Sequence, residues 1–139
     1  MIKYRFIRQA SPALLRQITD IYKEQGWWGR GDTPALLGRI ISRSCRFIIA
    51  EEEGRAVGMA RAIDAWSREA YIHDVAVLRS CRGRKIGSGL IRRLGARLRA
   101  DGMRWVGLIA SNGAAPFYRS LGFSSPPKAT AMMRGTRNV

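Results

Sequence analysis

The residues best suited to chemistry form a glycine-rich, basic segment near the middle of the chain. It reads Arg82-Gly83-Arg84-Lys85-Ile86-Gly87-Ser88-Gly89 and follows an apolar stretch typical of a strand. If a helix begins there, its first backbone N–H groups are unpaired and carry partial positive charge, which attracts phosphate oxygens. Glycines let the backbone approach such an anion closely. The segment therefore predicts a pyrophosphate-binding turn, and the plainer interpretation is a basic turn without a ligand.

The spacing of this segment excludes two common phosphate loops. A Walker A loop needs G-x-x-x-x-G-K-[ST], which the chain does not contain. A Rossmann turn needs G-x-G-x-x-G, and after Gly87 and Gly89 the third glycine position holds Arg92. The turn is therefore of another kind.

The charge of the chain indicates an anionic ligand or a strongly solvated surface. The 139 residues include 25 Lys and Arg against 10 Asp and Glu, a formal charge of +15. Eight cations and no acid lie between Arg79 and Arg99, and no acid follows Asp101. Such a charge attracts nucleic acid, acidic substrates or phosphorylated cofactors. Nucleic acid is not favoured, because the basic residues lack interleaved aromatic residues and a known reader motif.

The remaining pattern predicts an α/β chain in which these residues follow a strand. Apolar alternation and short apolar runs predict strands over 2–8, 46–50, 56–62, 70–78 and 104–110, with a last strand over 129–134. Helical spacing predicts helices over 12–25, from 34 to about 41, and over 112–120. A further helix, with an apolar arc from Ile86 to Leu98, is predicted to open from a glycine-rich turn over 82–89 and to stop at Gly102. We expect one domain over residues 1–139, with the strand–helix–strand unit 70–110 parallel.

Two segments carry a resemblance to a known family. Asp74-Val75-Ala76-Val77, followed by Arg82-Gly83-Arg84-Lys85-Ile86-Gly87, resembles the first signature of the GNAT superfamily of acetyl-CoA-dependent N-acetyltransferases: a strand D-V-x-V, a turn, then Arg/Gln-x-x-Gly-x-Gly/Ala. Residues 112–123 resemble the second signature, N-x-x-A-x-x-F-Y-x-x-x-G-F. The resemblance covers nearly the whole chain. It implies a mixed central sheet of about six or seven strands flanked by about four helices.

The first signature departs from the family pattern at one position. Counted from Val77, the family's arginine falls on Arg82 and its last glycine on Gly87, while Lys85 takes the place of the first glycine. A shifted register, Arg84-x-x-Gly87-x-Gly89, fits without exception but lengthens the turn by two residues. We prefer the first register because it places Leu90 and Leu94 on the buried face of the helix. Lys85 then either crowds the pyrophosphate or adds a contact to it.

The resemblance implies acetyl-CoA as co-substrate and no metal. The two parallel strands are expected to part beside the first signature, which frees backbone groups near Val75 and Val77. Asn112 matches a cofactor-contacting position, although an asparagine there is also a good helix N-cap. The residues expected to hold the cofactor are Val75, Ala76, Val77, Arg82, Gly83, Arg84, Lys85, Ile86, Gly87, Ser88, Asn112 and Phe117.

The resemblance also implies catalytic roles. Tyr118 matches the acid that protonates the departing thiolate, and its alternative is a tyrosine that caps the core beside Phe117. Asp74 and His73 are candidates for the base that accepts the amine proton. Neighbours in a strand point to opposite faces, so we expect at most one of the two to face the cleft. Glu69, Asp64 or a water chain would serve as well.

The acceptor site and the partners are less defined by the sequence. Trp27, Trp28 and Trp66 lie where this fold shapes its acceptor pocket, and tryptophans there suit an apolar or cationic amine. Alternatively, one of Trp27 and Trp28 packs on the core while the other forms a lid or dimer contact. We expect a small-molecule or peptide amine as acceptor, a homodimer, a cytoplasmic location and no membrane segment.

The predicted function is therefore transfer of an acetyl group from acetyl-CoA to an amine by direct attack in a ternary complex. Two other functions stay open. One is an acyl-CoA sensor without turnover, and the other is a basic module associated with nucleic acid or the ribosome. Cys45 and Cys81 lie far in the sequence from the single histidine, which excludes a zinc site.

Overall fold

The computed structural model describes residues 1–64 and 67–135. Trp66, one of the expected acceptor residues, therefore lies outside the described residues. The internal contacts divide the chain into two compact units, Met1–Leu108 and Ile109–Val139, which are described separately below. The expectation of a single domain stays a prediction.

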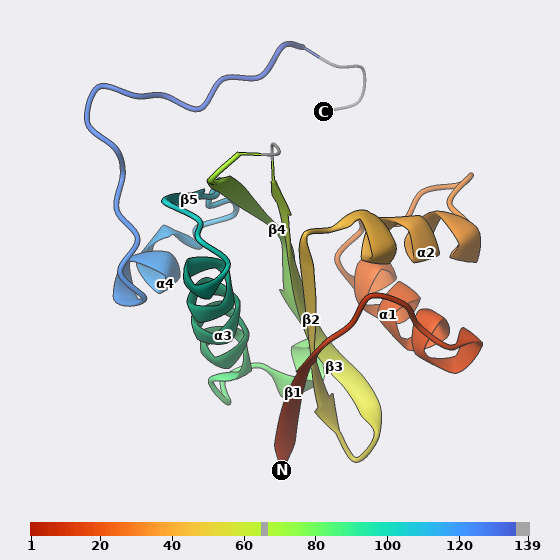
Figure 1. Ribbon diagram of the computed structural model, residues 1–139. Coiled ribbons are helices and arrows are strands. Elements are labelled where there is room, and N and C mark those ends of the chain that lie inside the picture. The colour runs from red at the N-terminus through yellow and green to blue at the C-terminus, as the bar shows by residue number, and fades with distance from the viewer. Residues whose placement is uncertain (65–66, 136–139) are drawn as a thin grey trace. The chain divides into compact units, whose positions relative to one another are not determined.

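The first unit is built on a mixed sheet whose strand order follows the sequence (Figure 1). In the described residues it has five strands: β1 (Ile2–Phe6), β2 (Arg46–Glu52), β3 (Arg55–Asp64), β4 (Glu69–Val77) and β5 (Trp105–Gly107). The first four pair antiparallel, and β5 pairs parallel to β4 as predicted. The α/β class is confirmed, but the expected six or seven strands are too many. The strand predicted over 104–110 is also shorter than expected.

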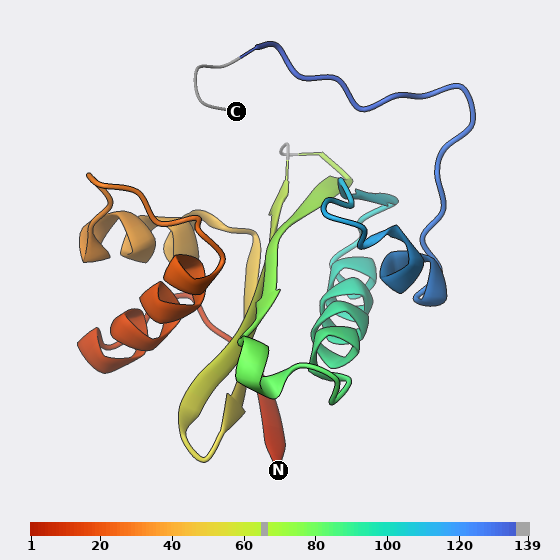
Figure 2. The ribbon, with the colours of Figure 1, turned by 180° about the vertical axis from the view of Figure 1, so that it is seen from behind.

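Two helices, α1 (Pro12–Glu24) and α2 (Pro34–Arg43), cover one side of this sheet (Figures 1 and 2). Each begins with a proline in its first turn, after a capping side chain. Ser11 accepts a hydrogen bond from the Leu14 N–H, and Thr33 accepts one from the Leu36 N–H, both at 3.2 Å. Such caps satisfy N–H groups that the helix leaves unpaired, and this explains where both helices begin.

A third helix, α3 (Ile86–Ala100), lies on the opposite side of the sheet (Figure 2). A single-turn 3-10 helix at Arg79–Cys81, which the sequence analysis did not predict, precedes the turn that leads into it. Leu90, Leu94 and Leu98 of α3 are fully buried, as the apolar arc predicted. On the strands, Phe47, Ile49 and Met59 are buried to the same degree. The core of this unit therefore lies on both sides of β2 and β3.

The second unit contains one short helix, α4 (Ala115–Ser120). The helix predicted over 112–120 starts three residues later, because Asn112 and Gly113 both have positive φ values, 53° and 76°. The strand predicted over 129–134 is wrong, since these residues form neither strand nor helix. The alternating pattern there has no partner strand in the described residues of this unit.

Candidate active site

The strand β4 is interrupted by a bulge at Asp74. Arg61 of β3 pairs with His73, whereas Met59 pairs with Ala76, so Asp74 and Val75 together face the single residue between them on β3. Asp74 has a φ of 54°, a left-handed conformation that aspartate tolerates better than most residues. The bulge re-aims the backbone of β4 at the position where the first signature begins.

Beyond the bulge, one edge of β4 has no strand beside it in the described residues. The strand β5 pairs only with Glu69, Ala70 and Tyr71, and it ends at Gly107 while β4 continues to Val77. This is the parting of parallel strands that the resemblance leads one to expect. One backbone group near this edge already has a partner, because the Arg82 Nε donates to the Val77 carbonyl at 3.1 Å.

The carboxylate of Asp74 is held by two donors. The Tyr22 hydroxyl donates to Asp74 Oδ2 at 2.7 Å, and Arg61 Nε donates to the same oxygen at 2.6 Å. Arg61 also lies 3.4 Å from the Ser44 hydroxyl at the end of α2. Burial, together with the negative charge of Asp74, raises the pKa of the Tyr22 phenol well above its usual range. Tyr22 is therefore a fixed hydrogen-bond donor. One carboxylate oxygen of Asp74, Oδ2, already accepts hydrogen bonds from both Tyr22 and Arg61.

The bulge places both candidate bases on the same side of the sheet. His73 pairs across the strands with Arg61, whose side chain reaches toward α1 and α2. Asp74 meets the Tyr22 hydroxyl of α1 on that same side. The extra residue in the bulge thus breaks the alternation that would place neighbouring residues on opposite sides. That at most one of the two faces the cleft stays a prediction.

The two expected acceptor tryptophans gather around Tyr22. The rings of Trp27 and Trp28 lie 6.2 Å and 6.1 Å from the Tyr22 ring, measured between centroids. Trp27 is 44% exposed and Trp28 is half-buried. The loop that carries them follows Gly26, whose φ is 76°, and is closed where the Gly29 N–H donates to the Asp32 carboxylate at 2.6 Å. Tyr22 therefore connects this aromatic loop to the bulge in β4.

The basic turn before α3 has the backbone that a glycine-rich cradle needs. Gly83 and Lys85 both have positive φ values, 77° and 63°, and Lys85 is the N-cap of α3. The family's first glycine falls on Lys85 in the preferred register, and the left-handed conformation at this position explains why a glycine suits it. Arg82, Gly83, Arg84 and Lys85 are all exposed to solvent, and the Arg84 guanidinium is paired with Glu52.

Gly89, on which the shifted register depends, packs against the sheet instead. A Cβ atom there would lie 2.1 Å from the Tyr4 hydroxyl. Leu90 and Leu94 are buried, as the preferred register requires. The need for glycine at position 89 is therefore explained by helix–sheet packing.

The family model of the GNAT acetyltransferases matches residues 13–123, which include both the bulged strand and the turn. The chain belongs to the GNAT acetyltransferase family. Two curated relatives are similar over about 55% of this chain: serotonin N-acetyltransferase 2 of Oryza sativa, 40% identical over 76 residues, and histone acetyltransferase TAP1 of Glycine max, 35% identical over 77 residues. The matched regions span only 38% and 33% of those relatives.

Solved structures of GNAT proteins show the same fold. A GNAT family acetyltransferase from Streptococcus pneumoniae superimposes with a TM-score of 0.80 at 22% identity, covering 99% of this chain and all of the other. At that identity the likeness establishes the GNAT fold.

The second GNAT signature lies in the second unit and is described there alone. Tyr118 packs edge-on against Phe117 and Phe123, with ring centroids 4.9 Å and 5.8 Å away. Burial raises the pKa of the Tyr118 phenol, which keeps the hydroxyl protonated at neutral pH. Asn112 is exposed and is not the N-cap of α4, a position that Ala114 takes, so the capping interpretation of Asn112 is wrong.

Three residues on the GNAT sheet escaped the sequence analysis. Arg61 carried a signal, since a charged residue within the otherwise apolar strand β3 needs a carboxylate partner. Tyr71 and Trp105 form an exposed aromatic pair at 5.0 Å, beside His73 at 6.4 Å from Tyr71. The Trp105 ring lies over Gly107, where an added Cβ would meet it at 2.2 Å.

Within residues 1–64 and 67–135, no group of three His, Cys, Asp or Glu side chains is arranged to hold a metal ion. No helix of that part of the chain is long and apolar enough to cross a membrane.

Proposed function

We propose that the protein transfers an acetyl group from acetyl-CoA to an amine. The observation that carries the proposal is the open edge of β4 between its bulge and the turn that begins α3. Backbone groups at such an edge suit the pantetheine arm and the acetyl carbonyl, and an N–H directed at that carbonyl oxygen stabilises the charge that develops on it. The family match and the two signatures support the same conclusion.

The turn and the first residues of α3 would bind the pyrophosphate. Two left-handed residues, Gly83 and Lys85, curve the backbone just before the helix begins. The unpaired amides of the first helical turn, including that of Ser88, offer N–H donors and partial positive charge. Lys85 and Arg82 add cationic side chains at an exposed position. In this proposal Lys85 adds a contact to the pyrophosphate.

The chemistry needs an acid and a base from this chain. The amine nitrogen attacks the thioester carbonyl, so that a carbon–nitrogen bond forms and the carbon–sulfur bond breaks. Tyr118, whose raised pKa keeps its proton at neutral pH, donates that proton to the departing thiolate. The amine proton passes to His73 or to an ordered water. Asp74 is already bound by Tyr22 and Arg61, which favours a positioning role for this carboxylate.

The acceptor would approach from the side of the sheet that carries α1 and α2. Trp27, Trp28 and the exposed Tyr71–Trp105 pair offer aromatic surface there. Aromatic faces suit a flat amine or a cationic one. The names of the two plant relatives supply acceptors to try, serotonin and a histone peptide.

Calorimetric titration with acetyl-CoA tests the cofactor part of this proposal. Ser88→Asp places a carboxylate in the first turn of α3, and we expect it to weaken acetyl-CoA binding at least tenfold. Ser42→Asp makes the same change on an exposed position of α2 and should leave binding unchanged. Equal weakening by both variants, or no acetyl-CoA binding by the unaltered protein, would contradict the proposal that the turn and the first residues of α3 bind the pyrophosphate.

Thiol release with an amine panel tests the transfer itself. We expect turnover with at least one amine and a lower kcat for Tyr118→Phe, with acetyl-CoA affinity retained. Binding without turnover for any amine would favour the acyl-CoA sensor instead.

A further inference from the structure

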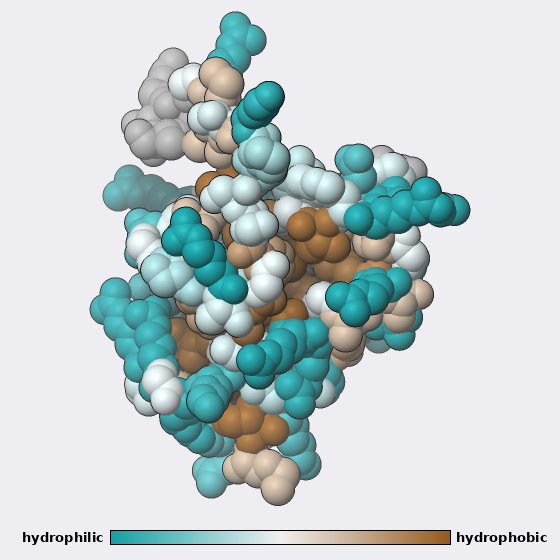
Figure 3. Space-filling model, turned by 90° about the vertical axis from the view of Figure 1, so that its left-hand side faces the viewer, coloured by the Kyte–Doolittle hydropathy of each residue, from teal (hydrophilic) through white to brown (hydrophobic). Residues whose placement is uncertain are grey.

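Two arginines lie on the outward side of α3. Arg92 and Arg99 are exposed, whereas Ile91, Leu94 and Leu98 are buried. Positions seven apart in a helix lie nearly above one another, about 10.5 Å apart along the axis. The two side chains therefore lie in a short line along the helix. Figure 3 shows that hydrophilic side chains cover much of one face of the molecule.

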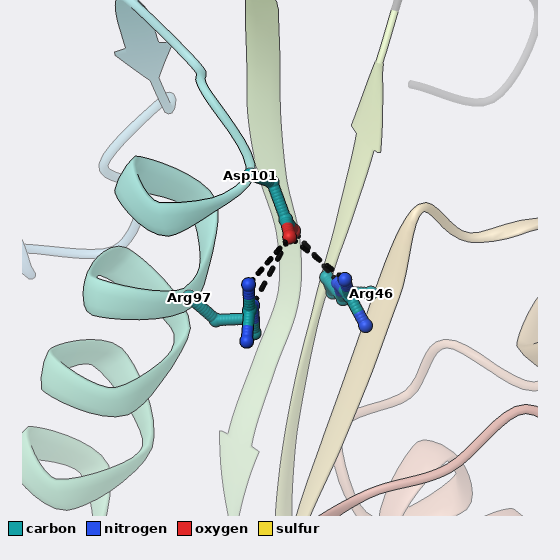
Figure 4. Close-up of polar contacts among 3 residues, drawn as sticks. All are labelled: Arg46, Arg97 and Asp101. Atoms are coloured by element: carbon teal, nitrogen blue, oxygen red, sulfur yellow. Dashed lines mark hydrogen bonds and ion pairs between the residues drawn. The ribbon is translucent and has the colours of Figure 1, made fainter.

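The acids around α3 are already neutralised. Asp101 at the end of the helix accepts from Arg46 and Arg97, as Figure 4 shows. On β2, Glu51 pairs with Arg5 and Glu52 pairs with Arg84.

Arg92 and Arg99 keep their charge unopposed. Among the described residues, neither has a carboxylate within ion-pair distance. Arg93, whose guanidinium carbon lies 3.9 Å from the centre of the Tyr4 ring, likewise keeps its charge.

The helices on the opposite side of the sheet carry fewer cations or more acids. Helix α1 carries Asp20 and Glu24 beside Arg16 and Lys23, and α2, which has no acid, carries only two arginines. Helix α3 carries four arginines, and no acid precedes Asp101 in either the helix or its turn, so the positive charge is densest there.

We propose that the outward face of α3, formed by Arg92 and Arg99 with Arg93 at its edge beside Tyr4, binds the sugar–phosphate backbone of a nucleic-acid double helix. Arginine forks bind phosphate oxygens in pairs and lose less hydration than lysine. A rigid row of charges fits a rigid, periodic polyanion, whereas a flexible acidic peptide would have to be ordered first. Because the exposed residues of α3 include no aromatic, the face has nothing on which unpaired bases could stack.

Binding of a labelled B-form DNA duplex of mixed sequence, measured against salt concentration, tests this face. Each phosphate neutralised contributes about 0.9 to the slope of log affinity against log salt. We expect the double variant Arg92→Gln/Arg99→Gln to reduce that slope by about 1.8. Arg16→Gln/Arg39→Gln removes the same charge from exposed positions of α1 and α2, and it should keep the slope of the unaltered protein.

Four outcomes would overturn the proposal. The first is no duplex binding at low salt, and the second is an equal loss of slope in the two double variants, which would leave only the net charge as the cause. The third is competition by poly-glutamate as effective as that by unlabelled duplex at equal charge concentration, which would indicate an acidic protein partner. The fourth is full displacement of the duplex by excess acetyl-CoA, which would move its binding to the turn before α3. Unchanged thermal unfolding of both double variants is the control for folding.

Discussion

Two aspartates on opposite sides of the sheet each accept hydrogen bonds from two side chains, but their donors differ. Asp74 is shared between Tyr22 and Arg61 in the bulge of β4, and Asp101 is shared between Arg46 and Arg97 at the end of α3. The first has a neutral, buried phenol as one donor, whereas the second has two arginines as donors (Figure 4), although the two carboxylate side chains are similarly exposed, 25% for Asp74 and 19% for Asp101. The Asp74 network therefore fixes a backbone position within the sheet, while the Asp101 network holds the end of α3 against β2.

The burial of its members decides how much each network contributes to the stability of the fold. Exposed ion pairs are screened by water and salt and add little to the free energy of unfolding. Removing one member of a desolvated network costs more, because the remaining polar groups lose their partner away from water. At Asp74 one of the remaining groups is the hydroxyl of Tyr22, a residue only 4% exposed, whereas at Asp101 the remaining groups are Arg46 and Arg97, whose side chains are 27% and 41% exposed.

The largest effect is expected from Asp74→Asn. Asparagine tolerates the positive φ of this position, so the change tests the charge and not backbone strain. We expect the free energy of unfolding to fall by about 2 kcal/mol, measured by urea denaturation. A double-mutant cycle with Tyr22→Phe should show coupling between the two residues. A loss no larger than that of Asp101→Asn would remove the distinction between the two networks.

A smaller effect is expected from Asp101→Asn, about 1 kcal/mol at pH 7. The hydrogen bonds from Arg46, and then those from Arg97, hold the pKa of Asp101 below its usual range. A carboxylate whose folded-state pKa is lowered stabilises the protein fully above its unfolded-state pKa of about 4, and that contribution is lost as the pH falls through the folded-state value. The difference in free energy of unfolding between the unaltered protein and Asp101→Asn should therefore become smaller in acid. If urea denaturation gave the same difference at neutral and at acidic pH, a charge effect would be contradicted.

The smallest effect is expected from Arg93→Met, which keeps the side-chain length and removes the cation above Tyr4. A cation over an aromatic ring at an exposed site contributes about 0.5 kcal/mol. Thermal unfolding of this variant, of Tyr4→Leu and of the pair together measures the coupling. Strict additivity would show that the stacking seen between Arg93 and Tyr4 does not stabilise the fold.

Local signals in the sequence predicted much of the fold. Ser11-Pro12 predicts the start of α1, and Asp32 or Thr33 before Pro34 predicts that of α2, where the structure selects Thr33. A capping oxygen and a proline in the first turn act within a few residues. The turn before α3 was predicted from its glycines and basic residues, but the left-handed conformation of Lys85 was not. Features whose cause lies within one helical turn are readable from the sequence.

The candidate site was only partly predictable because its contacts are distant in the sequence. Tyr22 and Asp74 are separated by 52 positions, and nothing near either residue indicates the other. The bulge at Asp74 depends on the pairing of β4 with β3, so strand alternation alone could not predict the sides on which His73 and Asp74 lie. The segment 129–134 alternates like a strand, but alternation does not supply a partner.

The strand order has a consequence for how the chain folds. β2, β3 and β4 follow one another in sequence and pair as neighbours, whereas β1 and β5 each join the sheet across helical segments. Closing short loops costs less chain entropy than closing long ones, and contacts between near neighbours form faster. We therefore expect the three central strands to form the earliest protected amides during refolding, so that the bulged strand is in place before the helices on either side dock against it.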